Sequence, residues 1–416
     1  MGVFIYNVFL FLFRTGIGIA SLFNPKAKQW IAGRKDIFTR LEHAFREKPP
    51  VIWVHCASLG EFEQGRPLIE ALREEYPSYK ILLTFFSPSG YENRKNYQGA
   101  DEIFYLPADS PSNSKRFLEI VNPSLVIFVK YEFWYYYLKK IKYRKMPLIL
   151  VSALFWQKMS FFKWYGALQR KMLTRFDHLF VQDRVSQQLL AGIGLADRIT
   201  ISGDTRFDRV AAIASTATRL PLVEKFIGQS RRVIVAGSTW PADEQLLAEV
   251  MADTDPEWKL IIAPHEIDGK HIEQVLERFP GATRYTDLEK NNPTDRVLII
   301  DNIGMLSRLY QYGYVSYIGG GLGKGIHNTL EAAVYGRPVF FGTVYHKFRE
   351  AGELISAGAA FSVDSADGMM DRLKKFNHDP ATWQHAGEQA AQYVLDNMGA
   401  TKKILDYIER EGLLVR

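Results

Sequence analysis

Short apolar runs alternate with helical patterns of apolar and polar residues from about residue 50 onward. In the first half of the chain, such runs predict strands at Val51–His55, Ile81–Phe85, Leu125–Val129, Leu148–Ser152, His178–Gln182 and Ile199–Ser202. Helical stretches fall between most of them, the clearest being Phe62–Glu75. This alternation is typical of βαβ units and predicts a parallel sheet covered by helices.

The pattern restarts after Arg209–Gln229, a weakly patterned stretch that we interpret as an interdomain connection. Further strands are predicted at Arg232–Ala236, Leu260–Ala263, Val297–Ile300, Val315–Ile318 and Pro338–Phe341. Their helices are expected to begin near Ala242, Gly269, Gly304, Asn328 and Lys347. Two successive α/β domains imply a cleft between them, and ligands of such sheets bind beyond the carboxyl ends of the strands.

An apolar segment precedes this pattern. Val3–Phe13 is almost wholly apolar, Arg14 interrupts it, and Ile17–Phe23 is apolar again. Basic residues follow at Lys26, Lys28, Arg34, Lys35 and Arg40. No basic residue precedes the apolar run, which argues against a cleaved signal peptide. We expect a helix that spans the membrane or lies in its interface, with the bulk of the protein on the cytoplasmic side. The alternative is an ordinary buried amphipathic helix.

Composition narrows the class of protein. The chain has 416 residues, 47% of them hydrophobic and 24% charged, which favours a folded protein of two domains. A formal net charge of +6 favours an anionic partner, such as a phosphate group or an acidic membrane surface, and falls well short of a nucleic-acid-binding composition. The single cysteine, Cys56, excludes an internal disulfide and fits a reducing cytoplasm. A cysteine like this is more often a small buried packing residue than a nucleophile.

Two carboxylates follow the first predicted strand, in the stretch "HCASLGEFEQGRPLIEAL" at 55–72. Glu61 and Glu63 lie where a helix is expected to begin, after a tight turn at Gly60. Either one would be stabilised in its ionised form by the helix dipole, which is a capping role. An ionised carboxylate at the edge of a cleft is also what a general base requires. The spacing alone leaves both interpretations open.

A third carboxylate, Glu132 of "KYEFWYYYLKK", follows Leu125–Val129 among aromatic residues. Such a carboxylate loses solvation and needs a partner, so a structural ion pair competes with a catalytic role. From 130 to 175 the chain interleaves aromatic with basic residues. This composition suits single-stranded nucleic acid or a membrane surface, and the apolar N-terminal segment favours the membrane. A solvated basic face over core aromatics is the alternative.

Weaker signals follow other predicted strands. Arg206 of "GDTRFDR" is suited to bidentate contact with a phosphate or carboxylate. Ser238 and Thr239 of "AGSTWPADEQ" can cap the next helix and offer backbone amides to an anion. In "APHEI", His265 follows Pro264, and a lone histidine is more often structural than a ligand. No second histidine or cysteine stands at metal-ligand spacing, so we predict no metal.

The most informative stretch is "YIGGGLGKGIHNTLEAAVYGRPVFFG" at 317–342, in which a strand runs into five glycines before a helix. Such a loop lets a phosphate approach the backbone. Its spacing is not that of a P-loop, and it does not follow the first strand of a domain, as a dinucleotide fingerprint would. Glu331 lies one turn into the helix on the side of Asn328, where a carboxylate can accept hydrogen bonds from ribose hydroxyls. A plain packing loop is the alternative.

Together these residues resemble the Kdo transferases (3-deoxy-D-manno-octulosonic acid transferases) of lipopolysaccharide synthesis. The resemblance covers nearly the whole chain and is carried by ordered motifs: "HCASLGE", "TFFSPSGYE", "YEFW", "GDTRFD", "GSTWPADE", "APHE", "DNIGML" and "GGGLGKGIHNTLEAA".

The resemblance implies a GT-B glycosyltransferase, in which two Rossmann-like domains face each other across a cleft. We accordingly expect a membrane-associated segment at 1–30, an acceptor-binding domain at 31–215 and a CMP-sugar-binding domain at 216–416. The resemblance implies CMP-Kdo as donor substrate, no further cofactor, and a phosphorylated lipid A precursor as acceptor. It places the protein on the cytoplasmic face of the inner membrane, with no nucleic-acid partner.

Carried over by position, Glu61 matches the catalytic base, and Glu132 and Arg206 match groups that stabilise the transition state. The matches to CMP-binding segments are Pro264, His265, Ile303, Gly304, Met305, Asn328, Thr329, Leu330 and Glu331. Four positions depart from the family pattern: Arg206 replaces a common lysine, no arginine follows Pro264, Met305 replaces a common glutamate, and Thr329 replaces a usual proline. The reaction expected is metal-independent and inverts the anomeric carbon.

Two other functions remain open at this point. A GT-B enzyme that uses a UDP-sugar, either a transferase or an epimerase, would bind UDP rather than CMP. A membrane-associated protein that binds nucleotides or nucleic acid would bind oligonucleotides with strong salt dependence and transfer no sugar.

Overall fold

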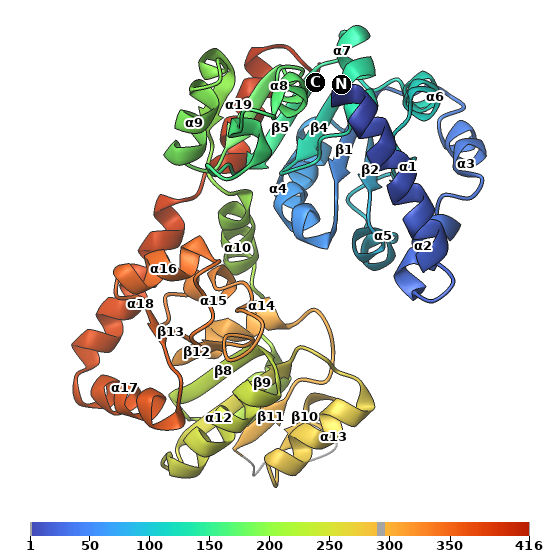
Figure 1. The fold of residues 1–416 in the computed structure, drawn as a ribbon. Coiled ribbons are helices and arrows are strands. Elements are labelled where there is room, and N and C mark those ends of the chain that lie inside the picture. The colour runs from blue at the N-terminus through green and yellow to red at the C-terminus, as the bar shows by residue number, and fades with distance from the viewer. Residues whose placement is uncertain (1, 289–295, 416) are drawn as a thin grey trace. The chain divides into compact units, whose positions relative to one another are not determined.

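The computed structural model of the protein describes residues 2–288 and 296–415. These residues form two compact units, each built on a parallel sheet between helices (Figure 1). The first unit comprises Met1–Asp208 and Gly399–Arg416, and the second comprises Arg209–Met398. Two α/β units of this kind confirm the predicted fold class.

Among the described residues, the sheet of the first unit has seven strands in the order β3-β2-β1-β4-β5-β6-β7. The strands are β1 (Val51–Cys56), β2 (Lys80–Phe85), β3 (Glu102–Tyr105), β4 (Leu125–Val129), β5 (Leu148–Ala153), β6 (His178–Val181) and β7 (Ile199–Ile201). The helices are α1 (Gly2–Ala20), α2 (Pro25–Ala32), α3 (Ile37–Ala44), α4 (Leu59–Glu75), α5 (Pro88–Arg94), α6 (Pro111–Val121), α7 (Tyr135–Tyr143), α8 (Ala167–Leu173), α9 (Arg184–Ala191) and α19 (Ala400–Arg410). α10 (Thr205–Ser215) begins in this unit and ends in the other.

The sheet of the second unit likewise shows seven strands in the described part of the chain, in the order β10-β11-β9-β8-β12-β13-β14. The strands are β8 (Arg232–Thr239), β9 (Trp258–Pro264), β10 (Thr283–Arg284), β11 (Val297–Ile299), β12 (Val315–Ile318), β13 (Val339–Phe341) and β14 (Ala360–Ser362). The helices are α11 (Pro221–Ile227), α12 (Pro241–Asp253), α13 (Gly269–Arg278), α14 (Leu306–Leu309), α15 (Leu330–Ala333), α16 (Arg349–Ser356), α17 (Ala366–His378) and α18 (Pro380–Asp396).

The central strand β1 explains why its sequence is a continuous apolar run. Every residue from Val51 to Cys56 is buried. Val51 and Trp53 join the core cluster on one face of the sheet, whereas Ile52, Val54 and Cys56 join the cluster on the other. A parallel sheet covered by helices on both faces requires this kind of two-sided burial. Its carboxyl edge, where β1, β4 and β5 end, stays available for polar side chains.

Three strands were not predicted: β3, β10 and β14. All three lie at an edge of their sheet. They are short, and Glu102, Arg284 and Ser362 in them are not buried. An edge strand is buried less completely, so its apolar signal is weaker than that of a central strand. The predicted interdomain connection, Arg209–Gln229, carries no strand, but it contains α11 and most of α10.

The expected domain limits differ from the observed units in two places. The first unit ends at Asp208 rather than at residue 215, and residues 399–416 belong to the first unit rather than to the second. The physical reason is burial: Ile404, Leu405 and Ile408 of α19 and Leu414 beyond it complete a core cluster of the first unit. The second unit is therefore inserted into the first along the chain.

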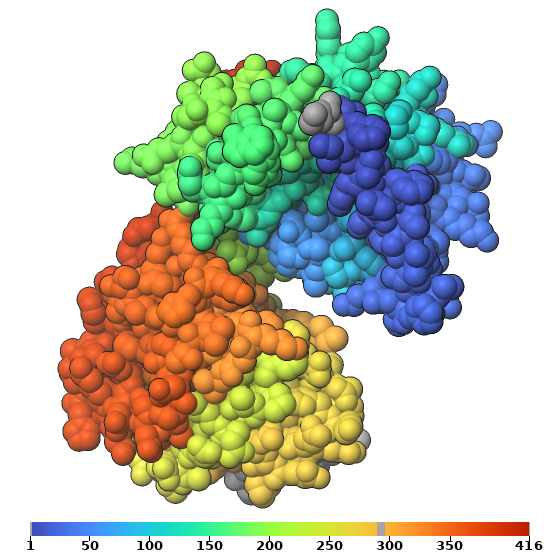
Figure 2. Space-filling view, viewed as in Figure 1, coloured from blue at the N-terminus to red at the C-terminus, as the bar shows by residue number. Residues whose placement is uncertain are grey.

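The apolar N-terminal segment forms α1, which lies on the surface of the first unit as the dark-blue ridge in Figure 2. Among the described residues, α1 is the one helix long and apolar enough to cross a membrane, and only 6% of its most apolar window is buried. Phe4, Ile5, Phe11 and Leu12 are exposed. This exposure contradicts the alternative of a buried amphipathic helix.

Candidate functional site

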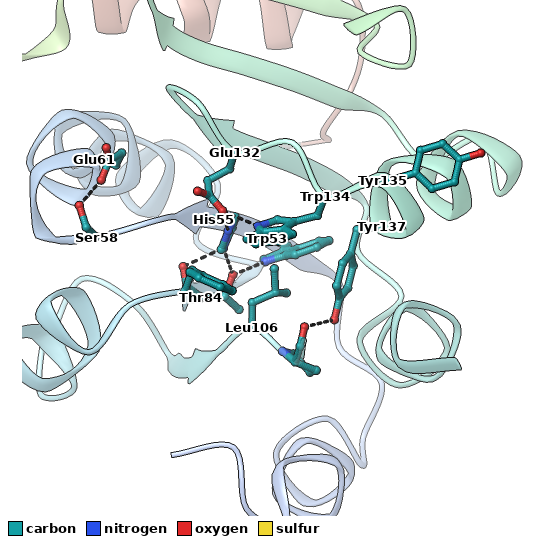
Figure 3. A network of polar contacts seen from close by, with 12 residues as sticks. Trp53, His55, Ser58, Glu61, Thr84, Leu106, Glu132, Trp134, Tyr135 and Tyr137 are labelled. Carbon is teal, nitrogen blue, oxygen red and sulfur yellow. Dashed lines mark hydrogen bonds and ion pairs between the residues drawn. The ribbon is translucent and has the colours of Figure 1, made fainter. Parts of the chain in front are cut away.

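Glu61 lies in the first turn of α4, just beyond the carboxyl end of β1. The hydroxyl of Ser58, which precedes the helix, donates a hydrogen bond to Oε2 of Glu61 (Figure 3). Both the helix dipole and this hydrogen bond favour the ionised carboxylate. Glu63 is held differently, since its Oε1 lies 3.0 Å from the guanidinium of Arg94 on α5. The geometry therefore separates the two carboxylates that the sequence left equivalent.

Glu132 lies in the short segment between β4 and α7, where Lys130 adopts a left-handed backbone with a φ of 61°. Two ring nitrogens point at one oxygen of its carboxylate, Oε2 (Figure 3). His55 Nε2 lies 3.0 Å away, and the other partner is Nε1 of Trp134. The side chain of Glu132 is 13% exposed, whereas that of His55 is fully buried. The partner that this desolvated carboxylate needs is thus the imidazole ring of His55, which lies on the adjacent strand β1.

A second set of hydrogen bonds lies behind His55. Its Nδ1 is 2.8 Å from the hydroxyl of Thr84 and 3.1 Å from the carbonyl oxygen of the same residue on β2. Trp53 Nε1 donates to that hydroxyl over 2.8 Å. Thr84 is fully buried. A continuous chain of polar contacts therefore runs from Thr84 on β2 through His55 on β1 to Glu132, just after β4 (Figure 3).

Arg206 lies at the start of α10, beyond the end of β7. Its Nε and NH2 groups contact Oδ2 of Asp204 over 2.9 and 2.8 Å, and its side chain is 25% exposed. Gln64 of α4 approaches the same Oδ2, at 3.4 Å, and its carbonyl accepts a hydrogen bond from Thr205. These contacts tie Arg206 to the helix that carries Glu61.

Tyr131 shows that these groups share one edge of the first sheet. Burial, and then the negative charges of Glu61, Asp183 and Asp204, raise the pKa of Tyr131 to about 12. Tyr131 is also the neighbour of Glu132 in sequence. Glu61 and Asp204 are thus near enough to Tyr131 for their charges to affect it, Glu132 is its neighbour in sequence, and Arg206 is paired with Asp204, so the three residues nominated for catalysis belong to the same end of the first sheet.

Cys56 is fully buried at the end of β1. Burial, followed by the charges of Glu61, Glu132 and Glu63, raises the pKa of its thiol well above the usual value. A nucleophilic cysteine needs the opposite shift and an accessible sulfur. Cys56 is a packing residue.

In the second unit, the glycine-rich loop follows β12 and is packed too tightly for side chains. A Cβ on Gly319 would lie 2.2 Å from the carbonyl oxygen of Ser238, and one on Gly321 would lie 2.5 Å from the backbone nitrogen of Gly342. Gly320 has a φ of 91°. The helix that follows, α15, has only four residues, from Leu330 to Ala333, and begins two residues later than expected. A helix this short has little dipole to offer an anion, and the amides of Gly319 and Gly320 already donate to Gly237 and Asp243.

Asp243 holds this loop to the start of α12. Its Oδ2 accepts hydrogen bonds from the backbone nitrogens of Gly320 and Trp240 over 2.8 and 2.9 Å. Its Oδ1 accepts one from the hydroxyl of Tyr317 over 2.9 Å. Burial raises the pKa of Asp243, although these hydrogen bonds oppose the shift. The carboxylate of "WPADE" is therefore a structural link beneath the loop.

His265 is part of a stack of three rings. Its ring centroid lies 4.6 Å from that of Trp240 and 4.5 Å from that of His327, nearly parallel to both. Trp240 Nε1 donates to Nε2 of His327 over 3.2 Å. Burial and then the charge of His265 lower the pKa of His327 to about 4. The sequence offered His265 as a lone histidine, and only the fold brings Trp240 and His327 to it.

The other expected nucleotide-binding residues lie at or near the ends of strands β9, β11 and β12. Pro264 ends β9, Ile303 is 87% exposed, Gly304 has a φ of 95°, and Met305 is buried. The side-chain amide of Asn328 donates to Oε1 of Glu331 over 3.1 Å, which confirms that these two residues share a side. Thr329 and Leu330 are fully buried. In the described residues, no group of three histidine, cysteine, aspartate or glutamate side chains is arranged to hold a metal ion.

The aromatic residues between 130 and 175 divide into two sets. Tyr135, Tyr136, Tyr137, Phe155 and Phe161 are buried in the core of the first unit. Another set is exposed: Tyr143, Trp156, Trp164 and Tyr165. Tyr135 and Tyr136 also contact α1, because the rings of both pack against Tyr6. The exposed set is the part of this stretch that can meet a membrane or an acceptor.

Comparisons with known proteins agree with the motifs. A family model described as 3-Deoxy-D-manno-octulosonic-acid transferase (kdotransferase) matches residues 34–209. The 3-deoxy-D-manno-octulosonic acid transferase of Aquifex aeolicus is 30% identical over 77% of this chain and 84% of its own length. The enzyme of the same name from Haemophilus influenzae is 25% identical over 95% of both chains.

Among solved structures, the UDP-GlcNAc 2-epimerase of Neisseria meningitidis is similar, with a TM-score of 0.61 over 87% of this chain and 100% of that chain. Its sequence identity of 17% means that the likeness extends to the fold alone.

Proposed function

The chain belongs to the family of 3-deoxy-D-manno-octulosonic acid transferases, and we propose that it moves Kdo from CMP-Kdo to a lipid IVA-type precursor of lipid A. Membership of the family makes the protein a glycosyltransferase that acts on Kdo in lipopolysaccharide biosynthesis. The donor, the acceptor and the roles of individual residues are the proposal. The observation that carries these roles is the placement of Glu61, Glu132 and the Asp204–Arg206 pair just beyond the carboxyl ends of strands β1, β4 and β7 of one sheet.

Glu61 acts as the general base. Its carboxylate has a hydroxyl partner, Ser58, rather than a cation, so it is held in place without being neutralised. It takes the proton from an acceptor hydroxyl while the acceptor oxygen forms a bond to the anomeric carbon of Kdo. The bond from that carbon to the phosphate oxygen breaks, and CMP leaves with the bonding electrons. Attack opposite the leaving group inverts the anomeric carbon.

Glu132 and Arg206 stabilise the charges that change during this step. The anomeric carbon becomes more positive as CMP departs, and a carboxylate such as Glu132 favours that charge. The leaving phosphate becomes more negative, and the guanidinium of Arg206 favours it. Asp204 aligns the guanidinium but also neutralises part of its charge. With Arg206 and backbone amides in these roles, the reaction needs no metal ion.

The second unit binds the cytidine nucleotide. The amides of Gly319 and Gly320 are bonded to Gly237 and Asp243, so later residues of the loop, from Gly321 onward, offer backbone amides to the phosphate, and Glu331 offers oxygens to the ribose. His265, stacked with Trp240 and His327, lies near the end of β9. Pro264, Ile303, Gly304, Met305, Asn328, Thr329 and Leu330 complete the proposed nucleotide site.

The acceptor is a membrane lipid, and α1 supports that assignment. Its exposed apolar residues fit the bilayer or its interface, at the cytoplasmic face of the inner membrane. Lys26, Lys28 and Lys35 follow it and would meet anionic headgroups. The exposed rings of Trp156, Trp164 and Tyr165 would lie at the same surface.

The experiment is transfer from CMP-Kdo to a lipid A precursor in detergent micelles, with the product read by mass spectrometry. We expect a mass increase of one or more Kdo residues and the release of CMP. Binding of CMP and UDP to the purified protein is measured in parallel. Tight binding of UDP with none of CMP would refute the donor, whereas CMP binding without transfer would refute the acceptor.

A further inference from the structure

His55 has no role in the proposed reaction, yet it is a buried titratable side chain in direct contact with a proposed catalytic group, Glu132. Its side chain has no exposed surface, and its ring lies 5.0 Å from that of Phe128. A buried imidazole must satisfy both ring nitrogens or lose the hydrogen bonds it made to water. Which nitrogen carries the proton is therefore fixed by the partners on each side.

The partners on one side are settled by chemistry. Oε2 of Glu132 receives the indole N–H of Trp134, which can only donate. An ionised carboxylate can only accept, so His55 Nε2, at 3.0 Å, must carry a proton to form a hydrogen bond with it. An unprotonated Nε2 would turn its lone pair toward a negative oxygen. The ionised form of Glu132 thus requires Nε2–H.

The partners on the other side fit the same arrangement. The hydroxyl oxygen of Thr84 accepts the indole N–H of Trp53, so its own hydrogen is available to donate. The nearest acceptor for it is His55 Nδ1 at 2.8 Å, closer than the 3.1 Å that separates Nδ1 from the Thr84 carbonyl. Nδ1 therefore accepts, and the Nε2–H tautomer gives both ring nitrogens a matching partner. Every donor in the line from Trp53 to Glu132 then faces an acceptor.

We propose that His55 is a positioning residue for Glu132, held by Thr84 as the neutral Nε2–H tautomer so that Glu132 stays ionised with one oxygen fixed. The proposal rests on the proposed role of Glu132 in transfer. Both ring donors go to Oε2, and Oε1 has no hydrogen-bond partner among the described residues. That second oxygen is the one left to meet the sugar. Thr84, which lies a whole strand away from Glu132, sets the protonation on which this geometry depends.

The test begins with the tautomer, which can be read without any substrate. Long-range ¹H–¹⁵N spectra of the full-length protein labelled at histidine distinguish Nε2–H, Nδ1–H and doubly protonated rings. The variant His55→Gln assigns the signal. We expect the Nε2–H form in the wild-type protein. A doubly protonated or Nδ1–H ring would overturn the proposal whatever sugar the enzyme transfers.

The second arm uses a matched pair at Thr84. Thr84→Val keeps the shape but removes the hydroxyl, so Nδ1 has only the backbone carbonyl as a partner and the ring should leave the neutral Nε2–H form, with Nδ1 protonated. In the transfer assay kcat should then fall by at least about tenfold with little change in KM, because the neutral donor that fixes Glu132 is replaced. Thr84→Ser keeps the hydroxyl and should retain the wild-type tautomer and most of the rate.

The control is a second buried histidine in the same sheet. His178 on β6 contacts the hydroxyl of Thr200 over 2.8 Å but has no carboxylate partner among the described residues. His178→Gln should leave kcat unchanged. A Thr84→Val protein that shows Nδ1–H with an undiminished kcat would refute the positioning role. If Thr84→Val does not fold, the wild-type tautomer and the rate of Thr84→Ser still decide. A complete absence of Kdo transfer by the wild type would refute the proposed function and leave the tautomer result standing.

Discussion

The carboxylate of Glu63 lies 3.0 Å from the guanidinium of Arg94, whereas Glu61, two residues earlier on the same helix, is held by the hydroxyl of Ser58. An ion-paired carboxylate is a poor general base because its cation occupies an oxygen and competes with the incoming proton. We therefore expect Glu61→Gln to lower kcat by about 10²- to 10⁴-fold in the transfer assay, with little change in the melting temperature.

Glu63→Gln is the matched control for Glu61→Gln. It removes a carboxylate from the same helix turn, but the interaction lost is the partly exposed ion pair with Arg94. We therefore expect kcat to stay within about threefold of wild type. Equal losses in the two variants would return Glu61 to a capping role.

The glycine-rich loop provides a test of the nucleotide site. Gly321→Ala places a Cβ 2.5 Å from the backbone of Gly342, so the loop must move or the second unit must lose about 1–3 kcal/mol of stability. We expect weaker binding of CMP by calorimetry. Gly323→Ala should bind CMP like wild type, because the nearest atom to its Cβ is 3.9 Å away. Unchanged CMP binding by Gly321→Ala would place the nucleotide elsewhere.

Asp109 should make stability depend on pH. Burial raises its pKa from 3.8 to about 6, against hydrogen bonds from Tyr136, Tyr6 and Tyr137. Between these two pKa values, Asp109 is protonated in the folded protein but ionised in the unfolded chain. The free energy of unfolding therefore falls by up to about 3 kcal/mol as pH rises from about 4 to about 6. Asp109→Asn stays neutral and should remove that part of the slope in denaturant titrations. Identical slopes for both proteins would contradict the burial assigned to Asp109.

Arg34 is a partly buried cation whose hydrogen bonds all go to backbone carbonyls. It donates to Phe86, Leu106 and Trp30 over 2.7, 2.9 and 3.0 Å, and burial lowers its pKa to about 9. Arg34→Met leaves three carbonyls without a donor and should destabilise the first unit by about 2–5 kcal/mol in thermal or chemical unfolding.

Arg116→Met provides the comparison for Arg34→Met. Its partner Glu42 is about half exposed, and loss of such a surface pair should cost no more than about 1 kcal/mol. A similar cost for the two variants would mean that the buried carbonyls around Arg34 find other donors.

The central strands of both sheets were predictable because burial on both faces leaves a continuous apolar run, as at Leu125–Val129 and Val315–Ile318. The edge strands β3, β10 and β14 were not, because they are short and partly exposed, whereas the edge strand β7 was predicted. The place of α19 was not predictable either. Its amphipathic pattern says that Ile404 and Ile408 are buried, but not which sheet they cover.

The candidate site shows the same division. That Glu132 needs a partner follows from its aromatic surroundings, but the partner His55 lies 77 residues earlier and becomes a neighbour only because β1 pairs with β4. His327 meets His265 and Trp240 through the order β9-β8-β12. Sequence motifs identify which residues carry chemistry, whereas the pairing of strands decides which of them touch.

The insertion of the second unit has a consequence for biosynthesis. Asp208 accepts a hydrogen bond from the backbone nitrogen of Gly399, 191 residues later, at the point where the chain returns to the first unit. A ribosome must therefore make the whole second unit before it makes the helix that completes the core of the first. During that interval Ile69 and Leu72 of α4 lack α19, whose Ile404 and Ile408 later join them in the same core cluster. The second unit is continuous in sequence, so it can fold before the last segment of the first unit has been synthesised.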